Sequence, residues 1–201
     1  MKKLYYIYDP MCSWCWGFKK TFHILKEQLA PSLEVVNVLG GLAPDSDEAM
    51  DENMQQMLQH VWRRVEETTG ASFNHTFWTM CTPRRSTYPA CRAVLAAKAF
   101  DKEEAMMTAL QEAYYLRALN PSDIATHKML AGELGIDESM YHKVLLSPKI
   151  EEALQEDLAL ARALHVQGFP SLVLEINYQR FPIRVDYNDV RMMRERIELL
   201  S

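Results

Sequence analysis

The sequence has no long apolar segment. Hydrophobic residues make up 48% of the 201-residue chain, which is ample for a core. No uninterrupted apolar run approaches the roughly 20 residues that a membrane helix needs. The stretch 1–10 is also too short and too aromatic for the apolar region of a signal peptide. We therefore expect a soluble, cytoplasmic protein without a membrane partner.

Basic residues are in the minority as well. The chain carries 22 Lys and Arg residues against 27 Asp and Glu residues, a formal net charge of -5. The basic residues are scattered among acidic ones, whereas proteins that bind nucleic acids concentrate them in a patch or stripe. The charge pattern therefore argues against a nucleic-acid partner.

Cysteine is scarce, and the four residues Cys12, Cys15, Cys81 and Cys91 are too few for a disulfide scaffold. Cys12 and Cys15 nevertheless form a CxxC pair, which in a reducing compartment is catalytic, redox-sensing or metal-binding. A zinc site would need two further ligands, and Cys81 and Cys91 lack the close spacing of a zinc knuckle. We favour redox chemistry and predict neither a metal site nor a resident cofactor.

The spacing of apolar residues predicts the order β-α-β, then helices, then β-β-α. The opening unit has a strand at 4–8, a helix at 14–29 that Pro31 closes, and a strand at 33–39. A loop at 71–88 interrupts the helical block. Its helices are expected at 46–69, 89–100, 102–118, 137–146 and 148–164, and one more helix follows the capping segment 120–123 and ends at 134. The closing unit has strands at 171–176 and 180–185 and a helix at 188–200.

A small mixed sheet that a helical block splits in the sequence is typical of one domain inserted into a loop of another. We therefore predict an α/β protein in which 1–45 and 149–201 form one domain and 46–148 forms an inserted all-helical subdomain. The sequence shows no repeat and no low-complexity segment.

The CxxC pair lies where the first strand ends and the first helix begins. Unpaired N–H groups and the helix dipole at such a position favour a thiolate. Cys12 is therefore expected to attack a partner disulfide, and Cys15, one turn deeper, to resolve the mixed disulfide. Ser13 and Trp14 carry no positive charge, so we expect less thiolate stabilisation than a histidine there would give.

A second signal is Gly168-Phe169-Pro170, directly before a predicted strand. A proline alone indicates little, because only about 5–6% of X-Pro bonds in folded proteins are cis and prolines often open strands. Its weight comes from the combination with the CxxC pair and the β-α-β opening.

Together these features resemble the DsbA-like branch of the thioredoxin superfamily, especially its FrnE-type members, which are predicted disulfide isomerases. The segment Asp9-Pro10-Met11-Cys12-Ser13-Trp14-Cys15-Trp16-Gly17 carries the resemblance most strongly, and Gly168-Phe169-Pro170 is similar to the family's cis-proline loop. The helical block matches its inserted subdomain, so the resemblance covers nearly the whole chain.

The resemblance implies a thioredoxin-like fold and a thiol-disulfide oxidoreductase of the protein disulfide isomerase kind. Cys12 and Cys15 would be catalytic, and the substrate-binding residues would be Ser13, Trp14, Phe169 and cis-Pro170. Protein or small-molecule thiols and disulfides would be the partners, with glutathione as a candidate co-substrate. Phe169 departs from the smaller residue often found before this proline, which leaves the substrate preference open.

Two alternatives stay open. Kappa-class glutathione transferases and hydroxychromene-carboxylate isomerases of the same superfamily carry serine at the first catalytic position, so cysteine at both positions favours disulfide chemistry. A non-enzymatic chaperone or metal-binding module that uses the helical block ranks last.

Weaker candidates have simpler structural interpretations. Arg84 and Arg85 could bind a glutathione carboxylate, although a short basic loop is usually solvated. Cys81 could form a regulatory disulfide, whereas Cys91 is expected to be a small buried residue. Aromatic residues could form an apolar rim beside the sulfurs or pack in the core, namely Trp14, Trp16, Phe18 and Trp78.

Overall fold

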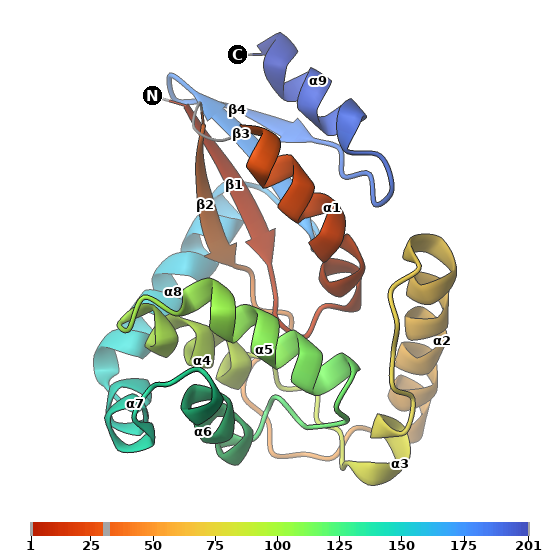
Figure 1. Cartoon of the computed structure of the whole chain (residues 1–201), viewed down its shortest axis with the longest axis vertical. Helices are drawn as coiled ribbons and strands as arrows, with labels where there is room; N and C mark the ends of the chain where they lie inside the picture. Colours follow the sequence, from red (N-terminus) through yellow and green to blue (C-terminus); the bar gives the residue numbers. More distant parts are fainter. Residues whose placement is uncertain (1, 30–32, 201) are drawn as a thin grey trace.

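Four strands form one mixed sheet in the order β2-β1-β3-β4 (Figure 1). The computed structural model describes residues 2–29 and 33–200. Strand β1 (Lys2–Tyr8) runs parallel to β2 (Glu34–Leu39) and antiparallel to β3 (Ser171–Ile176), and β3 pairs with the antiparallel strand β4 (Gln179–Ile183). The predicted α/β class is confirmed, while the expected end of the first helix at Pro31 lies outside the described residues.

Strand β1 lies inside the sheet and is covered on both faces. Its successive side chains point to opposite faces. Tyr6 packs in an apolar cluster with α1 (Ser13–Leu29) and α9 (Val190–Leu200), and Ile7 packs with the C-terminal end of α8 (Pro148–Ala163). This placement matters for function because the C-terminal end of β1 leads directly into the CxxC segment.

A tight turn joins β3 to β4. Asn177 and Tyr178 have φ angles of 49° and 67°, and positive φ at both central residues is typical of a type I′ hairpin turn. The predicted hairpin is therefore present, although β4 ends at Ile183 and not at 185.

A helical block separates the two parts of the sheet in the sequence. It comprises α2 (Glu52–Thr69), α3 (Phe77–Met80), α4 (Tyr88–Lys98), α5 (Glu103–Tyr115), α6 (Ile124–Glu133) and α7 (Glu138–Leu145). Figure 1 shows the block at the end of the sheet towards which β1 and β2 point. The boundaries predicted at 45 and 148 stay a prediction, because one apolar cluster joins the sheet to α4, α5 and α7.

Two elements of the block differ from the expectation. Helix α2 begins at Glu52 and not at 46, because the Asp51 carboxylate caps it by accepting the N–H of Met54 at 2.8 Å. It ends as predicted at Gly70, whose φ of 72° is readily adopted by glycine. The expected loop 71–88 contains the short helix α3. Its aromatic side chains had suggested a loop, but they fill the space between α2 and α5.

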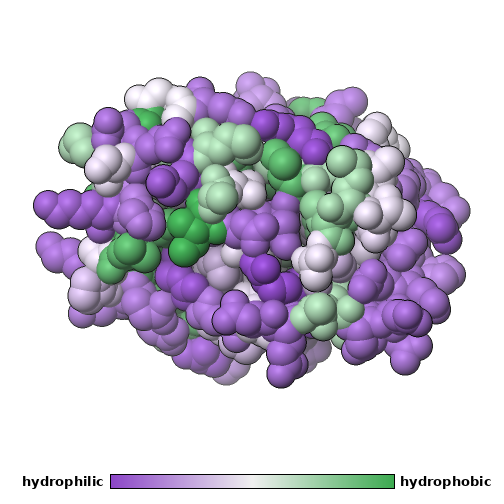
Figure 2. Space-filling view, turned by 90° about the horizontal axis from the view of Figure 1, so that it is seen from below, coloured by the Kyte–Doolittle hydropathy of each residue, from purple (hydrophilic) through white to green (hydrophobic). Residues whose placement is uncertain are grey.

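The surface of the block is largely polar. Seen from the end where α3, α6 and α7 lie, it is mostly hydrophilic, with apolar side chains in separate patches (Figure 2). Among the described residues, no helix combines the length and the apolar character that crossing a membrane would require.

Candidate active site

Cys12 and Cys15 lie where β1 gives way to α1. Cys12 directly precedes the helix, and its N–H donates to the carbonyl of Asp9 at 3.0 Å. The Cys12 sulfur accepts the backbone N–H of Cys15 at 3.3 Å. Both thiols are free, and Cys12 is 6% exposed whereas Cys15 is fully buried. Cys12 is therefore the sulfur that a substrate can reach.

Burial keeps Cys15 protonated. It raises the pKa of the Cys15 thiol well above its usual value, and the adjacent Cys12 sulfur adds to this effect. Burial also raises the pKa of Tyr6, whose side chain on β1 hydrogen-bonds to Cys15. Cys15 therefore rests as a neutral thiol within the core.

The Phe169–Pro170 peptide bond is cis, and its loop lies against Cys12. The Cys12 thiol donates to the carbonyl oxygen of Phe169 at 3.4 Å. The Phe169 ring lies over Gly40, where an added Cβ would be only 2.0 Å from the ring's Cζ atom. The glycine after β2 thus makes room for a bulky residue before the proline, a relationship that the sequence analysis missed.

Asp9, three residues before Cys12, is a second residue of the site to which the sequence pattern assigned no role. Its carboxylate is fully buried. Oδ1 accepts the N–H of Met11 at 2.7 Å, while Oδ2 accepts the N–H of Leu42 at 2.7 Å, the hydroxyl of Thr87 at 2.6 Å and the thiol of Cys91 at 3.7 Å. One carboxylate therefore ties the CxxC loop to the segment after β2 and to the N-terminal end of α4.

The environment of Asp9 sets its ionisation. Burial raises the pKa of the Asp9 carboxyl, and the hydrogen bonds from Thr87, Leu42 and Met11 only partly oppose this shift. A charged residue directly after a buried strand was the available signal, because a buried carboxylate needs several donors.

Cys12 opens into a cleft between the sheet and the helical block. Its volume is about 210 Å³. The apolar part of its wall includes Met11, Trp14, Met50, Met57, Leu58, Trp62 and Phe169. The polar part includes Ser13, Arg84, Arg85 and Thr87. The cleft is thus lined by residues of the CxxC segment, the helical block and the cis-proline loop, which surround the accessible thiol.

The loop 84–87, which carries Arg84 and Arg85, is more buried than its sequence suggested. Arg84 forms an ion pair with Asp123, and its Nε atom is buried without a hydrogen-bond partner among the described residues. Ser86 and Thr87 are buried beside it. Within this loop only Arg85 is exposed. The expectation of a solvated loop is therefore wrong for the other three residues.

The aromatic residues divide between the cleft and the core. Trp14 lines the cleft and packs on Tyr187, with ring centroids 5.0 Å apart. Phe18 and Trp78 are buried in apolar clusters, and Trp16 is partly buried against the cluster around α2 and α5. Of the four aromatic residues considered for a rim, only Trp14 takes that position.

The other two cysteines have separate surroundings. Cys81 donates to the carbonyl of Ala118 at 3.1 Å, and Cys91 is fully buried beside Asp9. Over the ranges 2–29 and 33–200, no cluster of three or more His, Cys, Asp or Glu residues is arranged to hold a metal ion.

A CxxC pair at a helix N-terminus that faces a cis-proline loop defines the class of thioredoxin-like proteins. The sequence matches the DSBA-like thioredoxin domain over residues 4–198, and the chain belongs to this family. The thioredoxin-like fold and the resemblance drawn from the sequence are therefore confirmed.

Solved structures of similar fold extend this assignment. One from Nitrosomonas europaea, provisionally described as a protein disulfide isomerase, has a TM-score of 0.85 and 28% identity and covers 98% of this chain and 96% of that chain. The cytosolic disulfide reductase DsbM from Pseudomonas aeruginosa has a TM-score of 0.79 and 22% identity over 98% of both chains, and it has also been solved with glutathione. A 2-hydroxychromene-2-carboxylate isomerase has a TM-score of 0.63 and 12% identity over 89% and 87% of the two chains.

A relative by sequence is longer than this chain. The ClpXP adapter protein SpxH from Halalkalibacterium halodurans is 24% identical over 183 residues, which cover 85% of this chain and 58% of that protein. The chain thus spans little more than half the length of this relative.

Proposed function

We propose that the chain is a thiol-disulfide oxidoreductase of the protein disulfide isomerase kind that works through Cys12 and Cys15. One observation carries the proposal: the accessible Cys12 sulfur lies between the N–H of Cys15 and the carbonyl of Phe169, next to cis-Pro170. A dithiol pair with one accessible and one buried sulfur suits attack by the first and resolution by the second.

The reaction balances with the two cysteines alone. The Cys12 thiolate attacks one sulfur of a substrate disulfide, forms a mixed disulfide and releases the other half as a thiolate. Cys15 then loses its proton and attacks the Cys12 sulfur, which releases the second half and leaves a Cys12–Cys15 disulfide. The substrate gains two electrons and the dithiol loses them, and the reverse sequence oxidises a dithiol.

The cleft indicates which substrates would fit. Its apolar wall suits a peptide or thiol side chain. The exposed Arg85 would pair with a carboxylate, because Arg84 is already paired with Asp123. Glutathione carries carboxylates and a thiol, so we propose it as a co-substrate beside protein thiols. A reducing cytoplasm would be the site of action, since a free CxxC pair persists there as a dithiol.

Two variants test the mechanism with a protein or small-molecule disulfide as substrate. Cys12→Ser should abolish turnover, whereas Cys15→Ser should still react once and retain a mixed disulfide that mass spectrometry detects. The matched control is Cys81→Ser, which changes a thiol outside the cleft and should keep full activity. Turnover by Cys12→Ser at the rate of the unchanged protein would refute the proposal.

Equilibration with glutathione redox buffers gives the potential of the pair. We expect a two-electron transition between about -270 and -120 mV, the range from thioredoxin to DsbA. A pair that never forms a disulfide would contradict the dithiol mechanism.

A glutathione-dependent isomerase or transferase is the second candidate. The fold shared with 2-hydroxychromene-2-carboxylate isomerase favours it, and the two cysteines oppose it. Calorimetry of the Cys12→Ser/Cys15→Ser variant with glutathione separates the two, because tight noncovalent binding that survives both substitutions would support the second candidate.

A further inference from the structure

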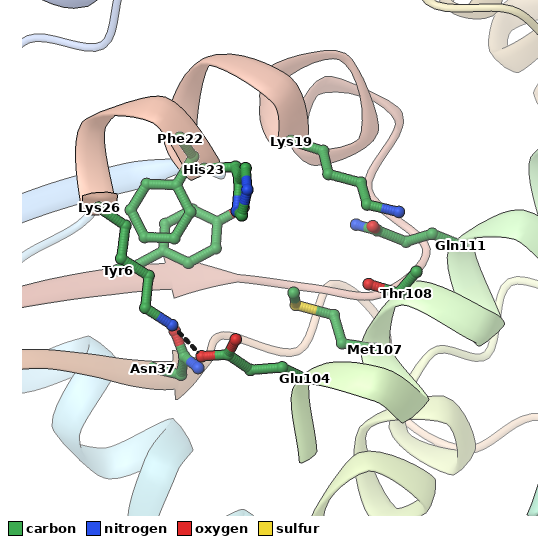
Figure 3. A pocket seen from close by; sticks show the side chains of 10 residues that line it. All are labelled: Tyr6, Lys19, Phe22, His23, Lys26, Asn37, Glu104, Met107, Thr108 and Gln111. Carbon is green, nitrogen blue, oxygen red and sulfur yellow. Dashed lines mark hydrogen bonds and ion pairs between the residues drawn. The ribbon is translucent and has the colours of Figure 1, made fainter. Parts of the chain in front are cut away.

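A second cavity lies between α1 and α5, and its lining shares no residue with the cleft at Cys12 (Figure 3). Tyr6 and Phe22 form an aromatic floor, with ring centroids 3.9 Å apart. Helix α5 contributes Met107, Thr108 and Gln111 to the opposite wall. The cavity volume is about 110 Å³, which is less than the roughly 150 Å³ of an enclosed apolar cavity that holds benzene. A single aromatic ring would therefore fill this cavity and extend through its open side.

One polar group in this cavity lacks a partner. Gln111 is only 1% exposed, and its Oε1 atom has no hydrogen-bond partner among the described residues. Figure 3 shows its amide directed across the cavity. Buried acceptors of this kind are almost always satisfied, so an N–H or O–H group of a bound molecule would complete the site.

Two lysines of the cavity lining form ion pairs, Lys19 near Gln111 and Lys26 at the other end (Figure 3). Lys26 forms an ion pair with Glu104 across the mouth, and Lys19 pairs with Glu112 at 3.3 Å. Each lysine of the lining is thus already paired with a carboxylate, Lys26 with Glu104 in the lining and Lys19 with Glu112 outside it. Exposed ion pairs contribute little stability, so a monoanion can replace Glu104 beside Lys26 at low cost.

We propose that the cavity between α1 and α5 binds a small, single-ring aromatic carboxylate that carries a hydrogen-bond donor opposite its carboxylate. The ring packs on Phe22 and Met107, the carboxylate pairs with Lys26, and the donor reaches Oε1 of Gln111. Lys26 and Gln111 stand at opposite ends of the cavity (Figure 3), so the carboxylate and the donor must lie on opposite sides of the ring. Binding at this site does not depend on the proposed redox function.

Calorimetry of the whole chain with 4-hydroxybenzoate tests the proposal. We expect saturable one-to-one binding with a Kd below about 1 mM. Lys26→Met should weaken it about tenfold and Gln111→Leu by a similar factor, whereas Glu104→Gln should tighten it about threefold because the competing carboxylate is gone. Lys20→Met, which removes an exposed lysine outside the lining, should leave the Kd unchanged.

The competing outcomes are distinct. Binding of the neutral probe 4-hydroxybenzyl alcohol with equal affinity, or no effect of Lys26→Met, would overturn the proposal, as would the absence of saturable binding. Cys12→Ser should bind 4-hydroxybenzoate like the unchanged protein, so a failure of the redox mechanism leaves this test intact. Circular dichroism of each variant verifies that its fold is retained.

Discussion

The Phe169 ring lies against Gly40, so closely that a methyl group on the glycine would come within 2.0 Å of the ring's Cζ atom. This contact joins the segment after β2 to the loop of cis-Pro170, whose preceding carbonyl accepts the Cys12 thiol. The space above Gly40 therefore determines where the Phe169 carbonyl stands relative to the accessible sulfur.

Gly40→Ala should impair the site through this contact. The added methyl group must push the Phe169 ring, and with it the carbonyl, away from Cys12. We expect the rate of disulfide cleavage by the reduced protein to fall about tenfold, equivalent to about 1.4 kcal/mol. Overpacking should also lower the free energy of unfolding by about 1–3 kcal/mol. Stopped-flow kinetics and urea denaturation measure the two effects.

Gly168, in the same loop as cis-Pro170, offers a matched control for Gly40→Ala. A methyl group on Gly168 would meet nothing within 4 Å, so Gly168→Ala should keep the normal rate. Adding Phe169→Ala to Gly40→Ala removes the clash and should restore stability, which a double-mutant cycle quantifies. Equal rates for the two glycine variants would show that the ring contact does not position the carbonyl.

The buried Asp9 carboxyl should make stability depend on pH. Because its pKa is raised in the folded state, the folded protein holds this proton more tightly than the unfolded chain. The resulting stability is fully present below the unfolded pKa of about 3.9 and is lost as the pH rises through the folded pKa. The stability advantage of the unchanged protein over Asp9→Asn should therefore shrink as the pH rises through this window.

Urea denaturation at a series of pH values measures the difference between the two proteins. Asp9→Asn should be less stable throughout the acidic part of the window, by about 1–3 kcal/mol, because the amide brings two N–H donors among the donors around this position, whereas the neutral carboxyl brings one. Asp47→Asn, at an exposed position, should show no such trend. A difference that grows with rising pH would have the wrong sign for a raised pKa.

Cys91 should be unreactive while the protein is folded. Burial raises the pKa of its thiol well above the usual value, and the neighbouring Asp9 adds to the shift. Since the thiolate is the nucleophile, iodoacetamide at neutral pH should modify Cys12 first and Cys91 only after unfolding in urea. Peptide mapping by mass spectrometry gives the order, and labelling of Cys91 at the rate of Cys12 would contradict its burial.

Much of this arrangement was available from sequence patterns. A buried strand followed by a CxxC pair and an amphipathic helix predicted the site at the end of β1, and the β-β-α ending predicted the hairpin and α9. These predictions succeed because the features are local. Neighbours in the sequence fix the conformation of Cys12 and Cys15 at the start of α1, and of Asn177 and Tyr178 in the hairpin turn.

The contacts that complete the site come from distant segments. The whole helical block and α8 separate Gly40 from Phe169 in the sequence, and four elements from α1 to α3 separate Asp9 from Thr87, so no local pattern relates these residues. The carboxylate of Asp9 and the arginines of the loop at 84–85 acquire their surroundings only when the block folds over the end of β1. Periodicity predicts which face of an element is buried, whereas it does not predict which polar groups meet there.

Arg85 should discriminate among substrates by charge. It lines the cleft of Cys12 and is exposed, whereas its neighbour Arg84 is already paired with Asp123. If Arg85 pairs with a substrate carboxylate, Arg85→Met should lower kcat/KM for glutathione disulfide about tenfold, since a hydrogen bond to a charged group contributes about 1.5–3 kcal/mol. The neutral 2-hydroxyethyl disulfide should react at an unchanged rate. Arg63→Met, on α2 outside the cleft lining, controls for the loss of a positive charge. If Arg85→Met lowered kcat/KM equally for both disulfides, Arg85 would have a structural role and would not recognise the substrate.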